Sequence, residues 1–192
     1  LFAVYSEWLH LIVRWVHIIV GVAWIGTSFY FNWLDSRLER DDPDFKHLDG
    51  YLWSVHSGGF YRIEKLKGPP KKLPKVLHWF KWEAYATWIS GFVLLILVYY
   101  LNASSMMLGA SGIILTPFQA ILISIFLLIG SWLLYDYLCK NVLKDNEQTL
   151  IATGVLLFVL LSYFLTQIYG SRAAYIHVGA IIGTIMAANV FR

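Results

Sequence analysis

Five apolar runs divide the sequence, and each is about as long as a helix must be to cross the hydrocarbon core of a bilayer. They cover residues 8–33, 84–101, 116–139, 149–169 and 173–191. Hydrophobic residues make up 58% of the 192 residues and charged residues only 14%, well below the roughly 25% of an ordinary soluble domain. The sequence therefore predicts an all-α integral membrane bundle of about five transmembrane helices, forming one domain over residues 1–192.

The distribution of basic residues predicts how these helices are oriented. The connection at 34–83 and the one after residue 139 carry lysines, whereas the connection at 102–115 has no charge and the last has only Arg172. Short connections rich in lysine and arginine stay on the cytoplasmic side. We therefore expect the N-terminus outside, the large 34–83 connection in the cytoplasm, and the lipid bilayer as the main partner of the apolar helices.

Ionisable residues follow one face of the first apolar run. His10, Arg14, His17, Gly21 and Trp24 recur there at helical spacing. Ionisable side chains are costly inside a bilayer unless they have partners, so this face is a candidate functional site.

The last apolar run carries a second histidine, His177. Counted back from the asparagines that end the two runs, His17 and His177 lie within about one helical turn of the same depth. Two neutral imidazoles at one depth can hold the iron of a b-type haem as axial ligands. We therefore predict a haem b between His17 and His177; the alternative is that each histidine only hydrogen-bonds to a neighbouring helix.

Further residues are expected to complete this cofactor site. Arg14 and Arg172 lie near the outer surface and could pair with the haem propionates, because a guanidinium matches a carboxylate fork. The small residues Gly21, Ala180 and Thr184 would line the site. His10, seven residues before His17, is a candidate ligand of a second site or a proton relay, and its alternative is a hydrated histidine at the interface.

A glycine-rich segment in the 34–83 connection is a candidate substrate site. In His56-Ser57-Gly58-Gly59-Phe60-Tyr61 the glycines allow backbone amides to approach a ligand, and His56 and Tyr61 add polar groups. Glu64, Lys65 and His78 could complete a cytoplasmic pocket for a planar anion. The alternative is a turn that lies on the membrane surface.

Several classes of site are excluded by the sequence. The single cysteine, Cys139, excludes an internal disulfide, a Cys-x-x-Cys-His haem attachment and a multi-cysteine metal site within this chain. The sequence has no pattern of a hydrolase triad, a phosphate-binding loop or a nucleic-acid-binding face, so we expect no nucleic-acid partner.

Four blocks of the sequence, taken in order, resemble the membrane-bound bacterial urate oxidases (urate hydroxylases of the PuuD type). They are residues 15–31, 56–61, 78–85 and 177–186. One position departs from the family pattern, which has His-Gly-Gly-Gly where this chain has Ser57 after His56. The resemblance implies an oxidoreductase of the bacterial inner membrane that hydroxylates urate and passes electrons to a cytochrome c.

Two other functions stay open. Fuller members of that family carry further helices and a cytochrome c domain, so a short relative could be an electron-transfer subunit, or a haem-free accessory subunit, of a larger respiratory complex. More faintly, His17, Trp24 and Gly26 resemble the first helix of the HemJ-type protoporphyrinogen oxidases, which are small haem-binding membrane proteins.

Overall fold

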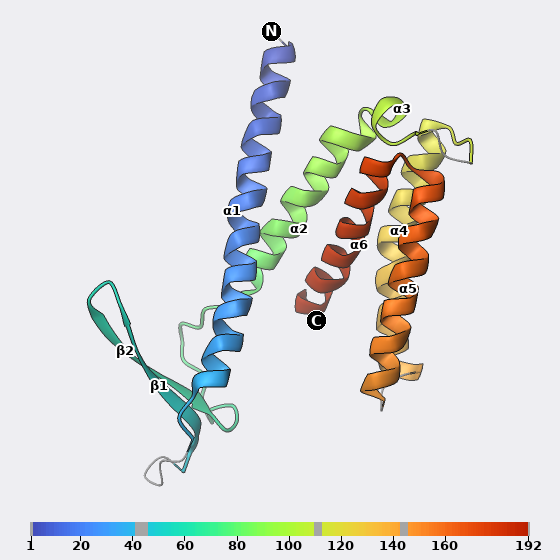
Figure 1. The fold of residues 1–192 in the computed structure, drawn as a ribbon. Helices are drawn as coiled ribbons and strands as arrows, with labels where there is room; N and C mark the ends of the chain where they lie inside the picture. Colours follow the sequence, from blue (N-terminus) through green and yellow to red (C-terminus); the bar gives the residue numbers. More distant parts are fainter. Residues whose placement is uncertain (1, 41–45, 110–112, 143–145, 192) are drawn as a thin grey trace. The chain divides into compact units, whose positions relative to one another are not determined.

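The computed structural model describes residues 2–40, 46–109, 113–142 and 146–191. The elements in chain order are α1 (Phe2–Arg37), β1 (Leu48–His56), β2 (Gly59–Leu66), α2 (Lys81–Leu95), α3 (Ala103–Met106), α4 (Pro117–Tyr137), α5 (Glu147–Ile168) and α6 (Ser171–Phe191) (Figure 1). Two π-helical segments, η2 (Ile96–Tyr100) and η3 (Leu138–Val142), extend α2 and α4. Within the described residues, α1, α2, α4, α5 and α6 are each long and apolar enough to cross a membrane, which confirms the predicted all-α class and its five spanning helices.

The chain divides into two compact units. The first comprises Leu1–Gly21 and Lys81–Arg192, and the second comprises Val22–Phe80. Helix α1 contributes its first half to one unit and its second half to the other.

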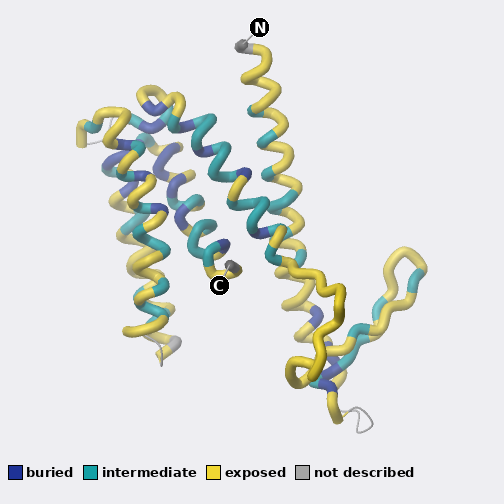
Figure 2. The backbone as a smooth tube through the Cα atoms, turned by 180° about the vertical axis from the view of Figure 1, so that it is seen from behind, coloured by how far each residue is buried: buried dark blue, intermediate teal, exposed yellow. Residues whose placement is uncertain are grey.

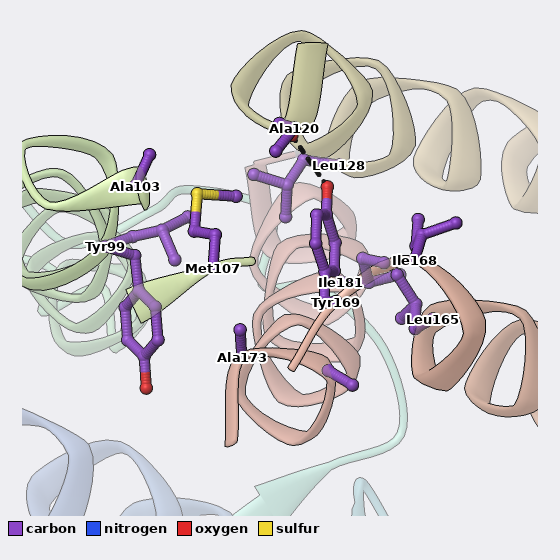
Figure 3. Close-up of a cluster of buried hydrophobic side chains, with 12 residues drawn as sticks. Tyr99, Ala103, Met107, Ala120, Leu128, Leu165, Ile168, Tyr169, Ala173 and Ile181 are labelled. Carbon is purple, nitrogen blue, oxygen red and sulfur yellow. Dashed lines mark hydrogen bonds between the residues drawn. The ribbon is translucent and has the colours of Figure 1, made fainter. Parts of the chain in front are cut away.

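Helix α6 is the central helix of the first unit. It packs against α2, α4 and α5 (Figure 1). Ala173, Ala174 and Ala187 are buried on α6, and such small side chains let neighbouring helices approach closely. Figure 3 shows the core that results, in which the Tyr169 hydroxyl donates a 2.8 Å hydrogen bond to the Ala120 carbonyl of α4.

The start of α4 follows from local sequence. Thr116 accepts a hydrogen bond from the backbone N–H of Gln119, and the Gln119 side chain accepts one from the backbone N–H of Thr116. Pro117 at the first helical position has no N–H that would need a partner. This reciprocal cap fixes where the helix begins, and therefore which of its side chains face α6.

The second unit contains an antiparallel β-hairpin that the sequence analysis did not predict. The register pairs Trp53 with Arg62 and His56 with Gly59, which leaves Ser57 and Gly58 as a two-residue turn. Their φ angles are 49° and 78°, and a turn with two positive φ angles matches the right-handed twist of the flanking strands. The Ser57-Gly58 dipeptide between two segments rich in aromatic and β-branched residues was the available signal for a hairpin.

The base of this hairpin is fixed to the end of α1. The N–H of Glu39 donates to the Tyr51 carbonyl at 2.8 Å, and the N–H of Tyr51 donates to the Glu39 carbonyl at 3.1 Å. Leu34, Leu38 and Leu48 are buried beside this bridge. The hairpin and the last turns of α1 therefore form one small packed unit.

Gly58→Ala should weaken the hairpin, because alanine at a positive φ costs roughly 1 kcal/mol. Hydrogen exchange of the β1 and β2 amides should become about fivefold faster. The matched control is Ser57→Gly, in which both turn positions accept positive φ without strain, so it should not accelerate exchange. Equal exchange in the wild type and in Gly58→Ala would contradict the turn.

The Lys65 ammonium joins the hairpin to α1 electrostatically. It forms ion pairs with the Asp35 carboxylate and, at 3.2 Å, with the Asp49 carboxylate. Two hydrogen bonds raise the pKa of Lys65 above its ordinary value of 10.5; the one to Asp35 has the larger effect and the one to Asp49 the smaller. Because the pKa of Lys65 is raised in the folded state, the two ion pairs stabilise the fold. This stabilisation is complete below pH 10.5 and is lost as the pH rises through the raised pKa.

Asp35→Asn should lower the pKa of Lys65 towards its ordinary value, since the first of its two carboxylate partners is lost. An NMR titration of the Lys65 side chain measures this change. Asp49→Asn should lower the same pKa by a smaller amount. If Lys65 titrates at the same pH in the wild type and in Asp35→Asn, the ion pair does not form in solution.

Candidate functional site

The predicted stripe on α1 coincides with the half-buried face of that helix. His10, His17, Gly21 and Trp24 are half-buried, whereas Arg14 is exposed. The residues between them are mostly exposed, as the yellow tube of α1 in Figure 2 shows. The helical spacing therefore predicted the face correctly, with Arg14 at its edge.

His17 is held against α2 through one ring nitrogen. Its Nδ1 lies 3.1 Å from the Thr87 carbonyl oxygen and 3.0 Å from the Ser90 hydroxyl oxygen. A carbonyl only accepts, and the Ser90 hydroxyl donates to the Ala86 carbonyl at 2.6 Å, so Nδ1 carries the proton. Nε2 then has a free lone pair, and no residue that the structure describes hydrogen-bonds to it.

A glycine on α2 makes this contact possible. A Cβ atom at Gly91 would lie 2.9 Å from Cε1 of His17, so any side chain there would push the ring away. By contrast, a Cβ atom at Gly21 would meet the Thr87 methyl group at 3.8 Å, an ordinary contact. Gly91, and not the predicted Gly21, therefore allows the close approach of α1 and α2.

His177 is buried in the core of the first unit, with 1% of its surface exposed. Its Nδ1 donates to the Ala173 carbonyl at 2.7 Å, so its Nε2 is the acceptor for the Ser124 hydroxyl at 2.8 Å. Since that hydroxyl donates to His177, the Tyr100 hydroxyl must donate to Ser124, at 2.6 Å. Both ring nitrogens of His177 are therefore engaged, in a hydrogen-bonded chain that joins the end of η2, α4 and α6.

The two predicted haem ligands contact different parts of the helix formed by α2 and η2. The His17 ring touches α2 at Gly91, while the His177 ring lies 6.1 Å from the ring of Tyr99. These two positions are eight residues apart, about 12 Å along the helix axis. The donor set of His17 fits an axial ligand, because Nδ1 is held and Nε2 is free. His177 fits that role only if Ser124 releases its Nε2.

The other predicted cofactor residues lie in separate places. Arg14 and Arg172 are exposed, and His10 is half-buried seven residues before His17. Thr184 accepts a 3.1 Å hydrogen bond from the indole N–H of Trp88 and donates to the Ala180 carbonyl at 2.7 Å. Thr184 and Ala180 therefore take part in a link between α2 and α6, beside the stacked rings of Trp88 and Phe92.

The predicted substrate residues are spread along the second unit. His56, Gly58 and Gly59 lie at the turn of the hairpin, and Tyr61 follows on β2. Lys65 lies six residues after Gly59, about 20 Å along the strand, where it pairs with Asp35 and Asp49. The His78 ring packs on the Phe80 ring at 4.5 Å, in the segment after the hairpin. The residues of the turn are therefore close to one another, and Lys65 lies at the other end of the hairpin.

Sequence reasoning missed the residues that orient the two histidines. Thr87, Ser90 and Gly91 lie on one part of α2, and Ser124 interrupts an otherwise apolar stretch of α4. Polar or very small residues inside a membrane helix were the available signal, because such residues mark contacts between helices. Their pairing with particular histidines could not be read from that signal.

Comparisons with known proteins give one match. No curated protein and no solved structure matches the chain. The family model described as urate oxidase N-terminal matches residues 3–192, which is nearly the whole sequence. The chain therefore belongs to the urate oxidase N-terminal family.

Proposed function

We propose that this chain is the membrane-embedded part of a bacterial oxidoreductase that oxidises urate, binds a b-type haem and passes electrons to a cytochrome c. Membership of the urate oxidase N-terminal family supports the substrate and the reaction class. Five helices that are long and apolar enough to span a membrane support its location in the inner membrane. The observation that carries the cofactor proposal is the orientation of His17, which leaves Nε2 free.

His17 is the residue that would hold the haem. The Thr87 carbonyl and the Ser90 hydroxyl fix the tautomer of His17 and orient its ring, as the hydrogen-bond partners of metal-binding histidines do. A bound haem b would supply reversible one-electron chemistry. Arg14 and Arg172 stay candidates for pairing with its propionates, and His177 is a candidate second ligand only in a state in which Ser124 has moved.

The polar face of the hairpin is the candidate contact for urate. Ser54, His56 and Tyr61 lie on one face, because side chains alternate along each strand and Ser54 pairs with Tyr61. These groups can donate and accept hydrogen bonds at the edge of a planar anion. His56→Ala should therefore raise KM for urate more than it lowers kcat, as loss of a binding contact does.

The test is to add urate to the oxidised, purified protein without oxygen and to record the visible spectrum. Urate should reduce the haem, so the α-band typical of haem b should appear. If a quinol reduces the haem while urate leaves it oxidised, urate is not the electron donor and the chain is an electron carrier. The same experiment on Tyr61→Phe tests whether the hairpin takes part.

A haem-free accessory subunit is the second candidate function. The observation that favours it is that both nitrogens of His177 are engaged within the protein. A wild-type protein that shows no α-band with any reductant would decide for this candidate.

Gly91→Ala should weaken haem binding about tenfold, because the new methyl group displaces the His17 ring from its partners. Haem content after passage through a competing apo-globin measures the change. Gly21→Ala is the matched control on the facing helix, where a methyl group meets only an ordinary contact, so it should retain haem. Equal haem retention in the two variants would show that the His17–Gly91 contact does not position the ligand.

A further inference from the structure

One face of the hairpin carries exposed apolar and aromatic side chains. The register pairs Val55 with Phe60 and Trp53 with Arg62, so these four residues share a face, opposite to Ser54, His56 and Tyr61. Phe60 is 79% exposed and Val55 is 62% exposed. We call Tyr51, Trp53, Val55, Phe60 and Arg62 the aromatic face.

A cation lies within this aromatic face. The Arg62 guanidinium is 5.0 Å from the centre of the Tyr51 ring and 5.8 Å from that of Trp53. It also pairs with Glu64 at 3.0 Å. Aromatic rings alternating with a basic group are typical of surfaces that lie in the headgroup region of a bilayer.

The segment that follows the hairpin is strongly basic and also apolar. From Lys65 to Trp82 the sequence has six lysines and no acidic residue. Lys71, Lys72 and Lys75 are exposed. Leu73, between these lysines, and Val76, directly after them, are exposed as well. Clusters of lysine next to a membrane helix attract anionic headgroups.

The end of this basic segment lies at an aromatic belt on α1. The Phe80 ring packs on the Phe31 ring at 5.1 Å, and Tyr30 packs on both Phe31 and Trp33. Aromatic rings near a helix end mark the level of the lipid headgroups. Lys75 is only five residues before Phe80, so the lysine cluster cannot lie far from that level.

The hairpin runs back from the end of α1 towards the level of the aromatic rings on that helix. Helix α1 has 36 residues, about 54 Å, so it is longer than the hydrocarbon core of about 30 Å and must extend beyond it. Figures 1 and 2 show that the hairpin starts below the end of α1 and rises to the height of the last turns of α1, Val22–Arg37. The turn of the hairpin is thus at the height of the last turns of α1, and not beyond the end of that helix.

We propose that the aromatic face and the lysines at 71, 72 and 75 bind anionic phospholipid headgroups at the membrane surface. The polar face, with His56 and Tyr61, then points towards water. The lipid contact holds the hairpin at a fixed height. This inference requires that α1 spans the membrane, but it does not require haem or urate to bind.

The test measures the depth of two spin labels on the full chain in nanodiscs. Labels are attached to Val55→Cys, on the aromatic face, and to Tyr61→Cys, on the polar face, after Cys139→Ser has removed the only natural cysteine. In discs of phosphatidylcholine with added phosphatidylglycerol, label 55 should be accessible to oxygen and label 61 to a water-soluble nickel chelate. In discs of phosphatidylcholine alone, label 55 should become more accessible to the chelate.

The lysines are tested by combining Lys71→Gln, Lys72→Gln and Lys75→Gln. The ratio of inserted to exposed label 55 should fall by about fivefold for each lysine removed. The control is Lys140→Gln, whose lysine pairs with Asp136 on α4 and lies outside the second unit, so it should leave label 55 inserted.

Two results would overturn the proposal. One is equal chelate accessibility of labels 55 and 61 in both kinds of disc. The other is a label 55 that is exposed in every disc but shielded in native membranes, which would assign the aromatic face to a protein partner. Both results are independent of whether urate reduces a haem, so they are distinct from a failure of the proposed function.

Discussion

His17→Ala should reduce the haem content from about one haem per chain to nearly none, because the imidazole that we propose to hold the iron is lost and alanine has no group to replace it. The pyridine haemochrome assay on purified protein measures this content. The fold should persist, because His17 is half-buried and its hydrogen bonds to Thr87 and Ser90 are the contacts that the variant loses.

The control for this variant is His10→Ala, which removes a histidine from the same face of α1 two turns earlier. It should retain both the haem and the helix content seen by circular dichroism. Full haem content in His17→Ala, with the wild-type α-band, would show that another residue binds the iron. Haem loss in His10→Ala with His17 intact would place the cofactor closer to the N-terminus of α1.

His177→Ala should have the largest effect on stability, about 2–5 kcal/mol, because it opens a cavity in the core and leaves the Ser124 hydroxyl without its acceptor. Reversible unfolding in mixed detergent micelles measures this loss. Ser124→Ala should cost only about 1–3 kcal/mol, since it removes a small group but leaves Nε2 of His177 and the Tyr100 hydroxyl unpaired.

His177→Gln separates the structural role from haem ligation. Glutamine can accept a hydrogen bond from Ser124 and donate one to the Ala173 carbonyl, so the folded protein should be recovered with most of its haem. Folded His177→Gln without haem would show that His177 binds the iron, and that Ser124 gives way when the cofactor enters. If His177→Ala is as stable as the wild type, the buried chain of hydrogen bonds through His177 does not contribute to stability, which would contradict the structure.

The sequence predicted the elements of this fold that depend on hydrophobicity alone. The five apolar runs correspond to α1, α2, α4, α5 and α6, and the stripe with His17 is the half-buried face of α1. The hairpin was missed, because Trp53 and Phe60 lie on the same side as Val55 while Leu52 and Ile63 lie on the other, so apolar residues occur on both faces. The two strands therefore lack the clean apolar–polar alternation that marks a half-buried strand.

The partners of the two histidines could not be predicted for a different reason. Depth was counted along each helix as if α1 and α6 were parallel and in register, but a residue count does not say which neighbouring helix a side chain faces. The structure places His17 against α2 and His177 against α4. Gly91 and Ser124 decide these contacts, and neither is adjacent in sequence to the histidine that it touches.

The visible absorption spectrum of the purified wild-type protein, oxidised and then reduced with dithionite, tests the central claim most directly. The account predicts an α-band of haem b with about one haem per chain, bound through His17. A spectrum with no Soret band and no α-band, from protein purified from cells supplied with haem precursors, would contradict it.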